Sequence, residues 1–106
     1  LNDPVYVEAA QALARRALEH AGTNSDQIAY AFRCCLLRPP HENELDMLVK
    51  LYNDSHATLA DRPDAAVKLA TVPSGKLPSD VNAVDAAAMT VVSNVLLNLD
   101  EMFLKR

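Results

Sequence analysis

Apolar residues recur along the chain at intervals of three and four, the spacing that places them on one face of a helix. This pattern predicts five helices separated by residues typical of helix ends and turns. We expect the helices at residues 3–20, from 24 to the Pro39-Pro40 pair, at 41–60, at 61–70 and from 80 or 82 to the C-terminus. Residues 71–79 hold two prolines and a glycine, so we expect an exposed loop there.

Several helix starts carry capping residues. Asp3 is a good N-cap and is followed by Pro4, which suits the first helical position. Asn24, with Gln27 three residues later, resembles a capping box for the second helix. For the last helix, Asp80 or Asn82 is the expected cap.

The last helix is expected to be the longest and to lie at the centre of the bundle. Its apolar residues cover about half of the helix circumference, which indicates packing against more than one neighbour. They are Val84, Ala88, Val91, Val92, Val95, Leu96, Leu99, Met102 and Phe103. We expect Leu99 on the centre line of this sector, and Thr90, Asn94 and Asn98 on the polar side opposite.

The composition supports a helical fold. Of the 106 residues, 17 are Ala and 15 are Leu, against one Ile and four Thr, which favours helix over strand. A chain of this length fits one domain with its own core. The sequence therefore predicts an all-α fold, a single compact bundle of about five helices over residues 1–106.

Charge and hydropathy exclude several kinds of partner. Fourteen acidic and ten basic residues are divided equally between the two halves of the chain, so no basic patch points to nucleic acid. No apolar run approaches the roughly 20 residues of a membrane span, and no signal-peptide pattern is visible. We expect neither nucleic-acid binding nor membrane insertion.

The residue types that carry most enzyme and metal chemistry are sparse. The three histidines form no metal-binding pair, and His56, on an apolar helical face, is expected to be a core or boundary residue rather than a ligand. Cys34 and Cys35 are neighbours on a helix, where their side chains diverge, so we expect them to be unbridged. We expect no catalytic residue, no cofactor and no metal in this segment.

Several short motifs are more specific than the composition. They are residues 1–10 and 13–16 at the start, Ala31-Phe32-Arg33, Leu37-Arg38-Pro39-Pro40 and Glu44-Leu45 in the middle, and residues 95–101 near the end. In these motifs the chain resembles the C-terminal part of the large planctomycete-specific domain of unknown function. That domain accompanies planctomycete-type cytochrome c domains in large exported proteins.

Two residues depart from the family pattern. Met89 stands where an aromatic residue is expected, which would thin the core locally, and His41 stands where a capping Ser or Thr is usual. The resemblance implies that the chain is an excised C-terminal fragment of an exported protein, located in the periplasm or at the cell surface. It also implies that any haem-binding motif lies upstream of Leu1, and it supplies no established activity.

We therefore expect a non-catalytic structural or interaction module whose partners are the rest of the parent protein and other exported proteins. The alternative is an accessory domain that completes a site of an enzyme or electron-transfer protein, with the chemistry upstream of residue 1. The candidate structural and interaction residues are Arg33, Arg38, Pro40, Glu44, Asn98, Asp100 and Glu101. In particular, the Asp100 carboxylate is expected to bind Arg33 or Arg38 and so fasten the end of the last helix.

Overall fold

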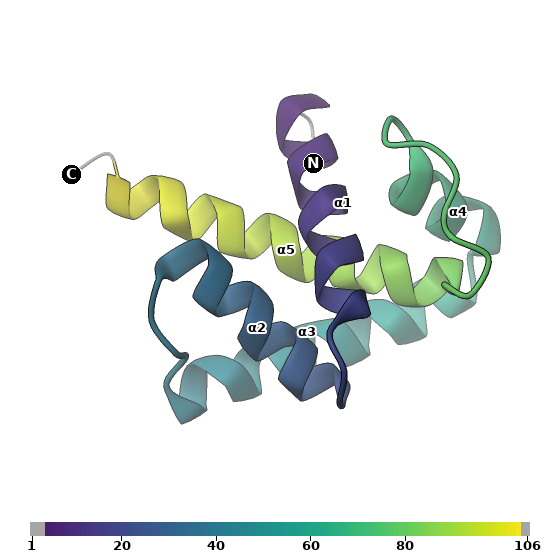
Figure 1. Cartoon of the computed structure of the whole chain (residues 1–106). Helices are drawn as coiled ribbons and strands as arrows, with labels where there is room; N and C mark the ends of the chain where they lie inside the picture. Colours follow the sequence, from purple (N-terminus) through teal and green to yellow (C-terminus); the bar gives the residue numbers. More distant parts are fainter. Residues whose placement is uncertain (1–3, 105–106) are drawn as a thin grey trace.

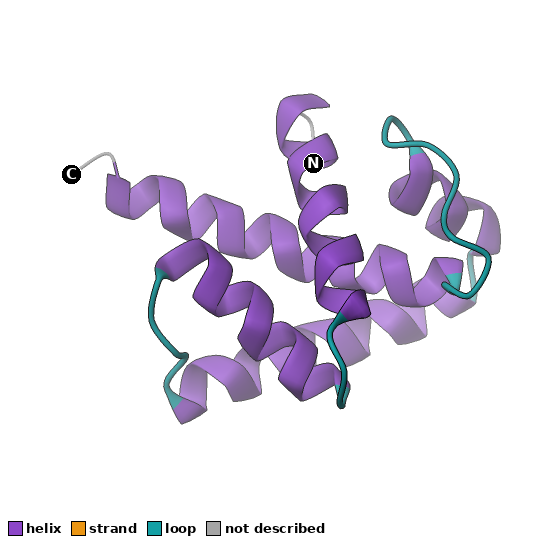
Figure 2. Ribbon diagram, in the orientation of Figure 1, coloured by secondary structure: helices purple, strands orange, loops and turns teal. Residues whose placement is uncertain are grey.

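The structure of the protein is a computed structural model that describes residues 4–104 and the side chains of residues 7–99. Between residues 4 and 104 the chain forms five helices and no strand (Figures 1 and 2). The helices are α1 (Pro4–Glu19), α2 (Asn24–Leu36), α3 (Glu42–Ala60), α4 (Pro63–Thr71) and α5 (Ala83–Leu104). The prediction of an all-α bundle of five helices is confirmed.

Helix α5 is the centre of the bundle, as the width of its apolar sector predicts. It contacts all four other helices, and Figure 1 shows α1 and α2 crossing it on one side and α3 running beneath it. Residues 86–90 are five consecutive buried positions, so this part of α5 is covered on every side. Such a helix has no polar face, which is why its sequence shows only a weak helical periodicity.

The prediction that Thr90 lies on a polar side of α5 is therefore wrong, because Thr90 is only 1% exposed. The Thr90 hydroxyl donates a hydrogen bond to the carbonyl of Ala86 at 2.7 Å. That bond allows a hydroxyl to be buried in the core without an unsatisfied donor. Asn98 is exposed, as expected.

The centre line of the buried face also differs from the prediction. Met89, Val92 and Leu96 are completely buried in the main core, whereas Leu99 is only half-buried. Figure 1 shows α5 continuing toward its C-terminus beyond the crossing with α1, so the cover is thinner there. Because Met89 is fully enclosed, this residue fills the position at which the family pattern predicts an aromatic side chain.

Two apolar clusters hold the bundle together. The main cluster joins α1, α2, α3 and α5 around Phe32 and Ile28. The second consists of Ala66 and Ala70 of α4 against Ala86 and Ala87 of α5. Small side chains at a helix crossing let the two helix axes approach closely, and α4 docks on α5 in this way.

The start of α2 is capped one residue earlier than predicted. Thr23 is the N-cap: its hydroxyl accepts from the Asp26 N–H at 3.2 Å, and the Asp26 carboxylate accepts from the Thr23 N–H at 3.0 Å. These bonds, from the Thr23 backbone first, lower the pKa of Asp26. Asn24 and Gln27 instead bond each other through their side chains at 3.1 Å. At the start of α5, Asn82 is the cap, because its side chain accepts from the N–H groups of Val84 and Asp85.

Candidate functional site

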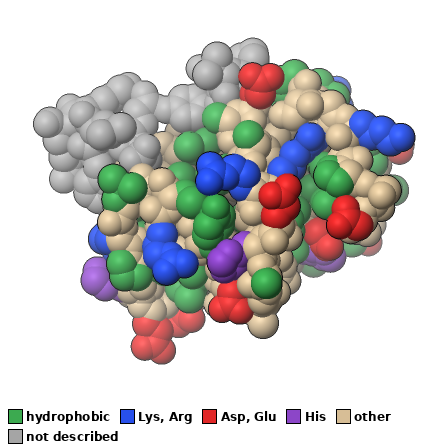
Figure 3. Space-filling model, viewed as in Figure 1, with side chains coloured by type: hydrophobic (Ala, Val, Ile, Leu, Met, Phe, Trp, Pro, Cys, Tyr) green, Lys and Arg blue, Asp and Glu red, His purple; other side chains and the backbone are tan. Residues whose placement is uncertain are grey.

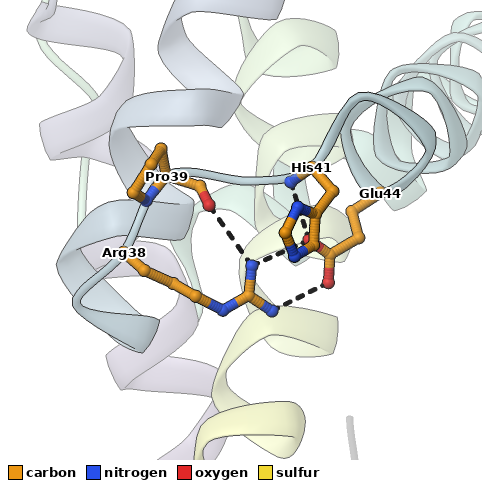
Figure 4. A network of polar contacts seen from close by, with 4 residues as sticks. All are labelled: Arg38, Pro39, His41 and Glu44. Carbon is orange, nitrogen blue, oxygen red and sulfur yellow. Dashed lines mark hydrogen bonds and ion pairs between the residues drawn. The ribbon is translucent and has the colours of Figure 1, made fainter.

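Two of the predicted interaction residues, Arg38 and Glu44, meet in the connection between α2 and α3, and a third, the half-buried Pro40, belongs to the same connection. The guanidinium of Arg38 donates to both carboxylate oxygens of Glu44, with each nitrogen–oxygen distance at 2.9 Å (Figure 4). The same guanidinium donates to the carbonyl of Pro39 at 3.2 Å and lies 5.0 Å from the centre of the Phe32 ring. Arg38 thus ties the end of α2, the connection and the start of α3 to the core.

Glu44 also takes part in capping α3. Its carboxylate accepts from the backbone N–H of His41 at 2.8 Å (Figure 4). The bond from Arg38, and then the bond from His41, lower the pKa of Glu44 to about 2. The Glu44 carboxylate in turn raises the pKa of Arg38. Half of the capping box at this helix start therefore comes from Glu44, whichever residue occupies position 41.

Leu37, at the end of α2, has an unusual conformation for its type. Its φ of 58° lies in the left-handed region that usually favours glycine. Its N–H donates to the carbonyl of Arg33 at 3.0 Å and so closes the helix. Its side chain is 88% exposed. A large apolar side chain thus stands out from a connection that Arg38 and Glu44 hold in place.

The other predicted residues lie apart from this connection. The side chain of Arg33 is exposed on α2, and that of Asn98 is exposed on α5. Asp100 and Glu101 belong to α5, but their side chains lie outside the described residues, and so does the predicted bond from Asp100 to Arg33 or Arg38. Arg38 instead binds Glu44, a carboxylate only six residues along the chain that was not predicted as its partner.

A polar hollow of about 260 Å³ lies between α2, α3 and α5. His56 Nε2 lies 2.7 Å from Asp85 Oδ1 at its edge, and Tyr52, 3% exposed, lies beneath. Burial, with a contribution from the Asp85 charge, raises the pKa of Tyr52 to about 12. His56 is half-buried, which agrees with the prediction of a core or boundary histidine. Asp85 was missed, although an acid in the first turn of the central helix is an obvious partner for a histidine that faces it.

Gln11 and Arg15 of α1 form a second polar cluster that the sequence did not predict. Gln11 is 1% exposed and donates to the carbonyls of Leu69 at 2.6 Å and Val72 at 2.8 Å. Its side-chain oxygen accepts from the Ser74 N–H at 3.2 Å. The guanidinium of Arg15 donates to the carbonyls of Ala70, Gly75 and Lys76. Both side chains therefore hold the end of α4 and the following loop against α1.

Two further hollows are more apolar. One, of about 300 Å³, lies between α3, α4 and α5 and is lined by Asp54, Ser55, Thr58, Leu59, Leu69 and Val91. The other, of about 330 Å³, is lined by Ala9, Ala12, Leu13, Arg16, Cys34, Cys35 and Leu97. Cys34 is exposed and Cys35 half-buried, and no disulfide joins them.

The arrangement offers little for chemistry. Among the described side chains, no group of three His, Cys, Asp or Glu residues could hold a metal ion. Within the same part of the chain, no helix is both long and apolar enough to cross a bilayer. On the face shown in Figure 3, acidic and basic side chains are interspersed. Of the three fully buried polar residues, Gln11 and Thr90 bind backbone carbonyls, whereas the Ser93 hydroxyl has no hydrogen-bond partner among the described residues.

A protein family matches part of the chain. The family described as PSD1, a protein of unknown function (DUF1553), matches residues 1–52, which contain α1, α2 and the first half of α3. No curated protein matches the chain, and neither does any solved structure. The matched part includes the Arg38–Glu44 connection. Over residues 1–52, just under half of its length, the chain is therefore similar to a domain of unknown function.

Proposed function

We propose that the chain is a non-catalytic helical module that serves the structure and interactions of a large exported protein. The observation that carries this proposal is that polar side chains inside the bundle form hydrogen bonds within the chain itself. Gln11 and Arg15 bind backbone carbonyls of the chain itself, and Arg38 binds Glu44. A site that binds substrate needs polar groups left open toward a hollow, and these groups are already occupied.

The location and the partners are part of the same proposal. We place the chain in the periplasm or at the cell surface, as part of a planctomycete-specific protein with cytochrome c domains. Both parts of this proposal rest on the resemblance in residues 1–10, 31–45 and 95–101. The partners are then the rest of the parent protein and other exported proteins. The similarity to PSD1 over residues 1–52 supports the domain-of-unknown-function part of this resemblance.

The alternative is an accessory domain that completes a catalytic or electron-transfer site. It requires Arg33 and Arg38 to line a concave surface together with carboxylates. Arg38 is instead neutralised by Glu44, and neither arginine lines any of the three hollows described above. We therefore favour the structural and interaction role.

The test compares the full-length parent protein with a form that lacks residues 1–106. Haem and metal content are measured in both, and binding of the deleted segment, added in trans, is measured by calorimetry. We expect unchanged haem and metal content, and binding of the segment to the rest of the parent. Loss of haem or metal on deletion would show instead that the chain completes a cofactor site.

A further inference from the structure

The hollow between α1, α2 and α5 differs from the other two hollows because it combines thiols with a cation. Its volume is about 330 Å³, and alanine and leucine side chains from α1 and α5 form most of its walls. Among its lining residues, the ionisable side chains are those of Arg16, Cys34 and Cys35. The hollow therefore offers an apolar surface, a positive charge and a nucleophilic sulfur close together.

The guanidinium of Arg16 is positioned by α2. It donates to the hydroxyl of Tyr30 at 3.3 Å, and the Tyr30 ring stacks on the ring of His20 with 4.7 Å between the ring centres. The hydrogen bond to Tyr30, then the charges of Tyr30 and of the Cys34 thiolate, raise the pKa of Arg16, and the charge of Glu19 contributes least. Among the described side chains, no carboxylate lies within ion-pair distance of Arg16. Its charge is therefore available to an anion.

Cys34 presents its thiol at the same hollow. It lies one helical turn after Tyr30, so both residues are on the face of α2 that Arg16 contacts. Its side chain is exposed and is joined by no disulfide. The lining contains no imidazole and no carboxylate that could serve as the general base of an acyl-transfer reaction. Thiol–disulfide exchange needs only a thiolate and an accessible disulfide, so exchange is the reaction that this lining supports.

We propose that Cys34 is a modification site that forms a mixed disulfide with a small disulfide carrying an apolar body and a carboxylate. The apolar body lies in the hollow, and the carboxylate pairs with Arg16. The Cys34 thiol gives its proton to solvent, and the resulting thiolate attacks one sulfur of the reagent. A new S–S bond forms as the S–S bond of the reagent breaks. The Cys34 sulfur is oxidised, and the departing half is reduced, leaving as a thiolate with the electron pair.

The sign of the charge preference distinguishes this site from an ordinary exposed thiol. The net charge of the chain is −4, so its overall field favours a cationic reagent, whereas Arg16 favours an anionic one locally. The probes are dithiobis(nitrobenzoate), an aromatic dianion, and cystamine, a dication. At low ionic strength we expect Arg16→Gln to slow the reaction of Cys34 with the dianion by about three- to tenfold and to leave its reaction with cystamine unslowed.

Arg33→Gln is the matched control for loss of charge. Arg33 is exposed and precedes Cys34 in the sequence, but it does not line the hollow. We expect this variant to slow the reaction with the dianion less than about twofold, because a charge outside the hollow is screened by solvent and salt. An equal slowing by Arg16→Gln and Arg33→Gln, or an equal effect of Arg16→Gln on both probes, would overturn the role of Arg16 and with it the proposal.

Two further variants test the thiol and the hollow in the full chain. Cys34→Ser should remove the fast phase of the reaction, since Cys35 is half-buried. Ala12→Leu fills the hollow and should slow the reaction with the dianion at least about threefold, by excluding its aromatic ring. Ala65→Leu is the control for the added volume, because Ala65 is an exposed alanine of α4 that lines none of the three hollows.

Stopped-flow absorbance of the released nitrothiobenzoate gives the rates with the dianion. Mass spectrometry of the intact and digested chain gives the rates with cystamine and locates each adduct. Circular dichroism checks that every variant is folded. A fast phase that persists in Cys34→Ser, or equal rates for Ala12→Leu and Ala65→Leu, would overturn the proposal. Either result leaves the proposed function standing, because that role is tested by haem content and binding in the parent protein.

Discussion

Arg38 and Glu44 are bound through two parallel hydrogen bonds of 2.9 Å, across the turn that separates α2 from α3. The pair differs from an ordinary surface ion pair in two respects. Its planar geometry satisfies both carboxylate oxygens, and the carboxylate also accepts the N–H of His41 at the helix start. One contact therefore orients the connection, caps α3 and supports the exposed Leu37.

The Arg38–Glu44 pair predicts an acid-sensitive contribution to stability. The pKa of Glu44 is lowered to about 2 in the folded chain, from about 4.5 when unfolded. Stability from this group is thus complete above pH 4.5 and is lost as the pH falls toward 2. We expect Glu44→Gln to destabilise the chain at pH 7 in urea denaturation and to have a much smaller effect near pH 2. Equal effects at both pH values would contradict this. In a double-mutant cycle, Arg38→Gln should add little to Glu44→Gln.

Substitutions in α5 test where its buried centre line runs. Leu96 is completely buried in the main core, so we expect Leu96→Ala to lower the free energy of unfolding by about 2–5 kcal/mol. Leu99, half-buried, is the matched control at the next turn, and Leu99→Ala should cost about 1 kcal/mol. Chemical denaturation measures both. If Leu99→Ala lowers the free energy of unfolding more than Leu96→Ala does, the buried face is centred on Leu99, as predicted from the sequence.

The helices themselves could be predicted because their apolar residues recur at helical spacing and their ends carry strong signals. The cap of α2 was placed one residue late because two patterns overlap: Thr23 with Asp26, and Asn24 with Gln27, both have the spacing of a capping box. Thr90 was misplaced for a different reason. Where neighbours cover a helix on all sides, the periodicity no longer shows which residues face out.

The polar contacts were harder to predict than the helices. Gln11 and Arg15 resemble ordinary polar residues of an amphipathic helix, and their acceptors are backbone carbonyls, which leave no trace in the side-chain pattern. Arg38 was singled out at the corner before the two prolines as a donor to Asp100. Its carboxylate partner, six residues along the chain, depends on the angle at which α3 leaves the turn. That angle is a property of the folded structure.

Gly22 is predicted to be required at the start of α2. Its φ is 119°, and a Cβ at this position would lie 2.4 Å from the Asp26 carboxylate. Gly22→Ala should therefore strain the backbone, by about 1–2 kcal/mol, and also push Asp26 away from Thr23. Gly75→Ala is the control, because Gly75 has a φ of 96° but no atom within 4 Å of the added Cβ. Thermal unfolding should show the larger loss for Gly22→Ala, and an equal loss would mean that the capping contact contributes nothing.

Gln11 is expected to determine whether the loop after α4 is held in place. Its amide satisfies two carbonyls, at Leu69 and Val72, and one N–H, at Ser74. Gln11→Met keeps most of the volume but leaves these backbone groups without their partner, which should cost about 2–4 kcal/mol. It should also speed hydrogen exchange at the Ser74 amide. The exchange rates of amides in the centre of α5 should change only as far as the free energy of global unfolding changes. The control is Gln27→Met, in a half-buried side chain that binds the His20 carbonyl at 3.2 Å, far from this loop. If Gln11→Met leaves Ser74 exchange at the rate of the control, the loop is held by Arg15 or by packing instead.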